Sequence, residues 1–122
     1  MAAGYAMLDY LQTQPELFER LDRKCAQLEE GLHTLLETKG LPYQINRLGS
    51  MLSLHFTDRP VVDFKTAALG NNDHFKNYFH GMLERGVYLP PSAFESYFLN
   101  DALTEEDIAF TLTAFEDWLK TK

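Results

Sequence analysis

The sequence has only one cysteine, Cys25, so no disulfide can form within the chain. This residue falls in a stretch of helical periodicity, where a buried and unreactive thiol is the expected state. A lone unpaired thiol is also typical of proteins of the reducing cytoplasm. No apolar run approaches the roughly 18 residues of a transmembrane helix, and the first residues do not have the pattern of a signal peptide. We therefore expect a cytoplasmic protein without a membrane-spanning segment.

Basic residues are also scarce. Lys and Arg total 11 against 18 Asp and Glu, which gives a formal net charge of −7. Nucleic acids and anionic membrane surfaces are bound through clustered Lys and Arg side chains, so neither is an expected partner. The scarcity is most pronounced over residues 88–104, which hold no Lys or Arg at all.

Common catalytic motifs are absent too. The sequence has no glycine-rich phosphate loop, no GxSxG nucleophile elbow and no HExxH zinc motif. Arg47, beside a Gly-Ser turn, is a candidate anion-binding residue, although an ordinary surface arginine explains it better. The four histidines fall on different expected elements, and none has a Cys or carboxylate partner at metal-ligand spacing, so we expect no metal site. They are His33, His55, His74 and His80.

The remaining composition is that of a globular domain, with 45% hydrophobic residues among 122. Residues 2–12 predict an Ala-rich helix that needs a neighbour to pack on. A second helix is expected to start near Thr13, with Pro15 in the first turn and a capping box to Glu16, and to end at Gly40. Its apolar stripe consists of Leu17, Leu21, Cys25, Leu28, Leu32 and Leu35.

A β-hairpin is expected next. Residues 43–47 and 51–56 both alternate between polar and apolar side chains, and the residues 48–50 between them supply a turn. Residues 61–72 are interpreted as a connecting segment. The buried face of the hairpin is predicted to consist of Leu52, Leu54 and Phe56.

Two further helices complete the predicted fold. The first is expected to be capped by Asn72 or Asp73 and to end at Gly86, after which residues 87–89 are apolar and strand-like. The last helix begins at Thr104 with an acidic first turn that suits the helix dipole. The two apolar faces consist of Phe75, Tyr78, Phe79, Met82 and Leu83 in one helix and Ile108, Leu112, Phe115 and Leu119 in the other. Helices on one side of a small antiparallel or mixed sheet predict an α+β fold of two layers.

One acidic residue is unusual in its setting. Glu95 lies in an expected loop, after the rigid pair Pro90-Pro91 and Ser92, and its neighbours are aromatic. A carboxylate among aromatic side chains is expected to be desolvated, and a desolvated carboxylate needs a partner or acquires a raised pKa. Because the surrounding residues hold no cation, the partner must come from elsewhere in the fold or from another molecule.

The sequence resembles the glutamate-1-semialdehyde 2,1-aminomutases, which are enzymes of the class III aminotransferase type. The resemblance spans nearly all 122 residues in the same order and spacing. It differs from the family pattern at Pro90, Asn100 and Leu103. The blocks that carry it are Met1–Gly4, Arg47–Met51, Leu54–Thr57, Pro60–Val61, Phe75–Phe79, Met82–Leu89, Pro91–Ser92, Phe94–Glu95, Phe98 and Thr104–Ile108.

The resemblance implies a fold, a cofactor and partners. It implies that residues 13–122 form the C-terminal small domain of a pyridoxal 5′-phosphate enzyme of fold type I, and that residues 1–12 continue a helix from a preceding large domain. That large domain would hold the cofactor and its lysine, so this chain alone is expected to be inactive and not to bind the cofactor. The family acts on a small amino acid and forms homodimers. Glu95 would reach the substrate region as a lid residue and bind an amine, and Ser92 would shape the loop.

Two rival hypotheses remain open at this point. One is the small domain of another class III aminotransferase. Many of these enzymes place an arginine from this region on the substrate carboxylate, and the absence of such an arginine over residues 88–104 argues against it. The other rival is an interaction module without enzymatic activity, whose aromatic loop docks on a partner protein.

Overall fold

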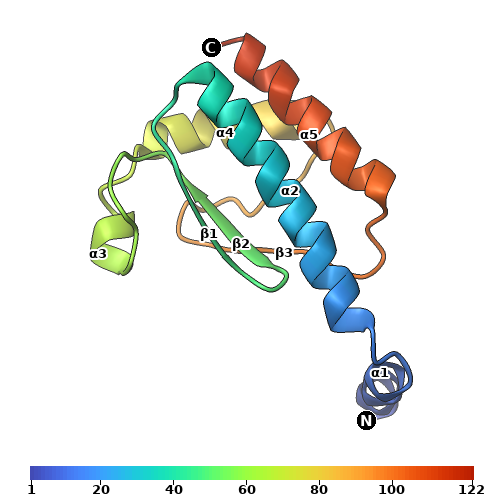
Figure 1. The fold of residues 1–122 in the computed structure, drawn as a ribbon. Helices are drawn as coiled ribbons and strands as arrows, with labels where there is room; N and C mark the ends of the chain where they lie inside the picture. The colour runs from blue at the N-terminus through green and yellow to red at the C-terminus, as the bar shows by residue number, and fades with distance from the viewer.

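The computed structural model describes all 122 residues and has two layers (Figure 1). Helices α2, α4 and α5 lie on one side of a three-stranded antiparallel sheet with the order β1-β2-β3, which confirms the predicted α+β class. In chain order the elements are α1 (Ala2–Thr13), α2 (Leu17–Lys39), β1 (Gln44–Leu48), β2 (Met51–His55), α3 (Phe64–Ala67), α4 (Asn72–Glu84), β3 (Tyr97–Phe98) and α5 (Glu105–Lys120).

The hairpin forms as predicted. Leu48 pairs with Met51, so the turn consists of two residues, and the first of them, Gly49, has the positive φ of 58° that such a turn requires. Leu52 and Leu54 face the helices and are almost completely buried, as is the side chain of Phe56 just after the strand. The alternation read from the sequence therefore identified the face of the sheet that forms the core.

The third strand is not where the sequence placed it. Residues 87–89 pair with no strand, and Pro90, which follows them, has no N–H to donate. Tyr97 and Phe98 instead pair with Leu52 and Met51 of β2. Tyr97 is buried in this position, and its hydroxyl donates a hydrogen bond of 3.3 Å to the hydroxyl of Tyr78.

Helix α2 has the predicted apolar face, with two corrections. Leu36 is buried, whereas Leu21 and Leu35 are only half-buried. The capping box between Thr13 and Glu16 does not form, because Thr13 is still part of α1 and its hydroxyl donates to the carbonyl of Asp9 at 2.9 Å. The other end is as predicted, since Gly40 adopts the left-handed conformation with φ of 70°.

The predicted start of α4 is wrong by one or two residues. Asn71, rather than Asn72 or Asp73, is the cap, and its side chain accepts a hydrogen bond of 3.0 Å from the His74 N–H. Leu83 is also exposed, in contrast to the predicted apolar face. The members of that face that are buried are Phe75, Tyr78 and Met82.

The ends of the other two helices are capped by side chains. The connecting segment 61–72 contains the short helix α3, which is capped by Asp63. The predicted start of α5 is confirmed: Thr104 is the cap, and it exchanges hydrogen bonds with Asp107 in a capping box.

Helix α1 stands apart from the two layers (Figure 1). None of its residues is buried, and its large apolar side chains Tyr5, Met7 and Leu8 are exposed. The predicted helix is therefore present without the neighbour that its apolar residues need. None of the helices in the chain has both the length and the apolar character that crossing a membrane requires.

Candidate functional site

The loop between α4 and β3 carries the two predicted site residues. Ser92 orders this loop, since its hydroxyl accepts a hydrogen bond of 3.2 Å from the Phe94 N–H and its carbonyl accepts one of 3.1 Å from the Glu95 N–H. This turn fixes the backbone at Glu95 just before the chain enters β3. Ser92 thus shapes the loop through hydrogen bonds with the backbone.

The carboxylate of Glu95 is exposed, which corrects the expectation that its aromatic neighbours desolvate it. The physical reason is that the aromatic side chains of this segment do not cover it: Tyr97 is buried in the core, whereas Phe98 is 71% exposed. Phe94 is also exposed and lies against Phe64, with the ring centroids 5.1 Å apart. No cation of the chain forms an ion pair with Glu95, and its side chain makes no hydrogen bond.

Glu95 lies at a pocket of about 410 Å³ between the loop and the start of α5. Nine of its 13 lining residues are hydrophobic, and its only charged side chains are Glu95 and Asp107. Asp107 already accepts hydrogen bonds from the N–H and hydroxyl of Thr104, so Glu95 is the one carboxylate of the pocket that is free to bind. The residues of the pocket wall are Leu28, Val87, Tyr88, Leu89, Pro90, Glu95, Tyr97, Phe98, Leu99, Leu103, Asp107, Ile108 and Thr111.

This composition decides which ligands the pocket suits. An exposed carboxylate at an apolar surface pairs with an ammonium or guanidinium group, and such a charged hydrogen bond is stronger than a neutral one. The pocket has no basic residue for a phosphate or carboxylate. Its residues therefore do not fit the phosphate of pyridoxal 5′-phosphate, and no lysine lines the pocket to bond with an aldehyde.

The cysteine and the histidines, which were not expected to form a site, have structural contacts. Burial raises the pKa of Cys25 to about 11, so its thiol is protonated and poorly nucleophilic. His33 contacts the hydroxyl of Tyr43 at 2.7 Å, and Nε2 of His55 lies 3.2 Å from the hydroxyl of Ser53. The chain contains no group of three or more His, Cys, Asp or Glu side chains that is arranged to hold a metal ion.

Arg47 is held by two carboxylates of α2. Its Nε lies 2.6 Å from Glu29 and its Nη1 lies 2.7 Å from Asp22. Because the guanidinium is already paired, it is not free to bind an anion. Arg47 is therefore closer to an ordinary surface arginine than to an anion-binding residue. Its ion pairs also join the hairpin to α2.

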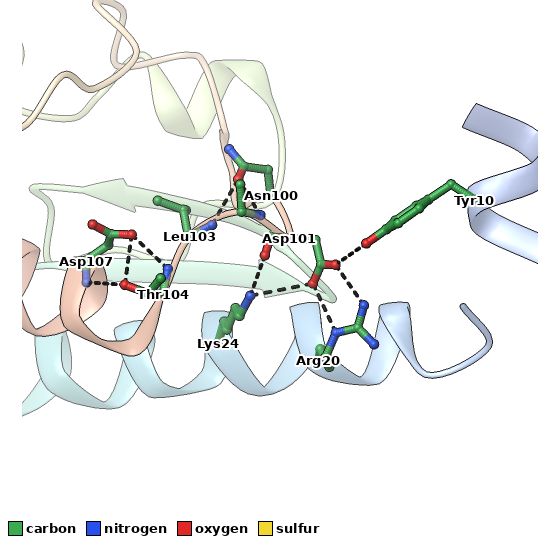
Figure 2. A network of polar contacts seen from close by, with 9 residues as sticks. Tyr10, Arg20, Lys24, Asn100, Asp101, Leu103, Thr104 and Asp107 are labelled. Carbon is green, nitrogen blue, oxygen red and sulfur yellow. Dashed lines mark hydrogen bonds and ion pairs between the residues drawn. The ribbon is translucent and has the colours of Figure 1, made fainter. Parts of the chain in front are cut away.

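The polar network just after β3 was not predicted from the sequence. The side chain of Asn100 accepts hydrogen bonds from the N–H groups of Ala102 and Leu103, which orders the loop at two of the positions that depart from the family pattern. Asp101 then pairs with Arg20 of α2, as Figure 2 shows. These partners are 81 residues apart in sequence, so no local pattern could have indicated the pair.

Comparison with known proteins gives strong matches over nearly the whole chain, although no family model matches it. It is 52% identical over 121 residues to a glutamate-1-semialdehyde 2,1-aminomutase of Flavobacterium johnsoniae, and 46% identical over 119 residues to one of Thermus thermophilus. These alignments cover 99% and 98% of this chain but only 28% of each relative. The chain thus spans less than a third of the length of these relatives.

Solved structures share the fold. A crystal structure of a glutamate-1-semialdehyde aminomutase from Pseudomonas aeruginosa, in complex with PMP, matches 86% of this chain with a TM-score of 0.76 and 24% identity, and the match covers 23% of that chain. An omega-transaminase from Sphaerobacter thermophilus matches 84% of this chain and 24% of its own, with a TM-score of 0.68 and 22% identity.

The α+β fold is therefore one that occurs within transaminase chains, and the identities of 52% and 46% are to glutamate-1-semialdehyde 2,1-aminomutases. Over nearly all of its length, the chain is related to one part of the glutamate-1-semialdehyde 2,1-aminomutases, which confirms the resemblance seen in the sequence.

Proposed function

We propose that this chain is the C-terminal small domain of a glutamate-1-semialdehyde 2,1-aminomutase. The complete enzyme would convert glutamate 1-semialdehyde to 5-aminolevulinate for tetrapyrrole synthesis, with pyridoxal 5′-phosphate as its cofactor. The observation that carries this proposal is the 52% identity over 121 residues to a protein of that name. We expect the complete enzyme to be a cytoplasmic homodimer.

Helix α1 supports the division into domains. It has no buried residue, and its apolar side chains Tyr5, Met7 and Leu8 face solvent. A helix with such a surface gains stability by packing on another element. Residues 1–12 would therefore continue a helix from a preceding large domain, and residues 13–122 would form the small domain.

The cofactor would be held by the large domain. The pocket beside Glu95 has no basic side chain for the phosphate, so we expect no binding by this chain alone. When bound in the whole enzyme, the cofactor would supply the chemistry that moves an amino group between adjacent carbons. A direct test is to mix the 122-residue chain with pyridoxal 5′-phosphate. A one-to-one complex through a single lysine would contradict this placement of the cofactor.

Glu95 would contribute from the lid side of the active site. Its carboxylate is exposed and unpaired, and the turn at Ser92 fixes its backbone, so it is free to accept hydrogen bonds from the ammonium of a small amino acid. In this role Glu95 binds and orients the amine. Ser92 keeps its hydroxyl on the Phe94 N–H and takes no chemical step.

The test of this role is Glu95→Gln in the full-length enzyme. The loss of one charged hydrogen bond, typically about 1.5–3 kcal/mol, is expected to lower kcat/KM by about 10- to 100-fold, with the fold and the bound cofactor unchanged. Glu105→Gln is the matched control, because Glu105 is an exposed acid of α5 that does not line the pocket. Equal kinetics for both variants would remove Glu95 from the site.

A second candidate function is the small domain of another class III aminotransferase. The fold shared with the omega-transaminase favours it. The absence of Lys and Arg over residues 88–104 disfavours it, because a carboxylate of a second substrate would lack its arginine there. The full-length protein decides between the two: the aminomutase acts on glutamate 1-semialdehyde without a second amino acid, whereas an aminotransferase requires an amino acceptor.

A further inference from the structure

The direction of α1 is set by very few contacts. Residues 14–16 separate α1 from α2, and the chain turns there around Pro15. No residue of α1 is buried and only Leu11 is half-buried, so little apolar packing orients the helix. The one side-chain hydrogen bond from α1 to the two-layered body comes from Tyr10, whose hydroxyl donates to Asp101 at 2.8 Å.

Asp101 gathers three partners from two helices, as Figure 2 shows. Arg20 of α2 binds its carboxylate with two hydrogen bonds, at 3.1 Å and 2.7 Å. Lys24, one helical turn later, donates to the backbone carbonyl of Asp101 at 2.9 Å, and its Nζ lies 3.6 Å from the carboxylate. The fourth member of this cluster, which we call the Asp101 clasp, is Tyr10 of α1.

The Asp101 clasp is also close in sequence to the candidate site. Asp101 comes three residues after Phe98, which lines the pocket of Glu95, and directly after Asn100, whose side chain orders the following turn. The hydrogen bonds from Arg20 and Tyr10 hold the pKa of the Asp101 carboxyl well below its usual range. The carboxylate is therefore charged throughout the neutral pH range, so it keeps its ion pair with Arg20 and its hydrogen bond with Tyr10.

We propose that Asp101 is a positioning residue that fixes, through Tyr10, the direction of α1 relative to the loop that carries Glu95. This inference rests on the proposed function in one respect: α1 leads to the large domain, so its direction sets where that domain lies relative to Glu95. The bidentate pair with Arg20 holds Asp101 on α2, and the hydroxyl of Tyr10 holds α1 on Asp101.

The first test measures the direction of α1 in the 122-residue chain, without any activity. Spin labels are attached to cysteines introduced at Ala3 in α1 and Ala109 in α5, both of which are exposed. Cys25 is buried and stays unlabelled. The unmodified clasp is expected to give one narrow distance peak by double electron–electron resonance.

Substitutions separate the clasp from general effects. Tyr10→Phe removes only the hydroxyl that holds α1, and Asp101→Ala removes the shared acceptor, so both are expected to lose the narrow peak and give a broad distribution. Tyr5→Phe is the matched control, because Tyr5 lies in the same helix and its hydroxyl makes no hydrogen bond within the chain. A narrow peak in Tyr10→Phe, or an equally broad distribution in the unsubstituted chain, would refute the proposal that Asp101 fixes the direction of α1 through Tyr10.

The second test uses the full-length protein. Tyr10→Phe is expected to lower kcat/KM while the amount and absorbance of the bound cofactor stay the same. If the distance peak broadens but kcat/KM is unchanged, the positioning role is refuted. If the full-length protein has no aminomutase activity at all, the proposed function fails, and the distance measurement still decides whether Asp101 holds α1.

Discussion

Gly81 of α4 lies directly against Trp118 of α5, so closely that a β-carbon at residue 81 would overlap Cδ1 of the indole ring. Trp118 is 2% exposed and is surrounded by the rings of Tyr78, Phe115 and Phe56. These rings leave the indole little room to move. The glycine is therefore what allows the two helices to approach at this point.

We expect Gly81→Ala to destabilise the chain. Alanine favours the helix by about 1 kcal/mol over glycine, but an overpacked core position costs about 1–3 kcal/mol, so a net loss of up to about 2 kcal/mol in the free energy of unfolding is expected. Urea unfolding followed by circular dichroism measures it. The control is Gly4→Ala in α1, where no atom lies within 4 Å of the new β-carbon. Equal stability of the two variants would show that α4 and α5 are not packed as described.

Thr104→Ala tests the start of α5. The hydroxyl of Thr104 accepts a hydrogen bond of 3.2 Å from the Asp107 N–H, and loss of such a cap costs about 1 kcal/mol. Thr113→Ala is the comparison, because Thr113 lies on the exposed side of the same helix and its hydroxyl contacts only the Ala109 carbonyl. We expect the midpoint of urea unfolding to fall for Thr104→Ala alone.

His74 is expected to make stability depend on pH. Burial, with a smaller contribution from the charge of Lys122, lowers the pKa of His74 below its usual 6.5, and its Nε2 is buried without a hydrogen-bond partner in the chain. The ring lies edge-on against Phe56, with the centroids 4.3 Å apart. The unfolded chain therefore binds a proton more readily than the folded chain does.

The sign of the effect follows from proton linkage. The contribution of His74 to stability is complete above pH 6.5 and is lost as the pH falls from there through the lowered pKa of the folded state. Free energies of unfolding measured between pH 8 and pH 5 are expected to decrease toward acid, and less steeply in His74→Phe. His80→Gln, on the exposed side of the same helix, is the control. An unchanged slope in His74→Phe would contradict this assignment.

Features that depend on nearby residues could be predicted from the sequence. The stripe of α2, its end at Gly40 and the start of α5 at Thr104 each arise within one helix or one turn. The hairpin is equally local, because its strands are joined by two residues. The predicted helices, the hairpin and the α+β class are for this reason confirmed.

Features that depend on distant partners could not be predicted. Tyr97 forms a strand because it pairs with the edge of β2 and its hydroxyl binds that of Tyr78. A strand of only two residues has no sequence pattern that could indicate this pairing. The same holds for the candidate site. The sequence placed Glu95 on a loop, but its exposure depends on where the folded chain places the surrounding aromatic side chains, and the pair of Asp101 with Arg20 joins residues 81 positions apart.

The last prediction concerns the independence of α1 from the core. Removal of residues 1–13 takes away no buried side chain, and Asp101 keeps its partners Arg20 and Lys24. We expect residues 14–122 to unfold in one cooperative transition, with a free energy within about 0.5 kcal/mol of the intact chain, as for changes at exposed positions. Removal of residues 109–122 is the contrasting deletion, because it takes Phe115 and Trp118 from the core and is expected to abolish the transition. If the chain without residues 1–13 also lost its cooperative unfolding, α1 would have to belong to the core, and the position of this helix outside the two layers would be wrong.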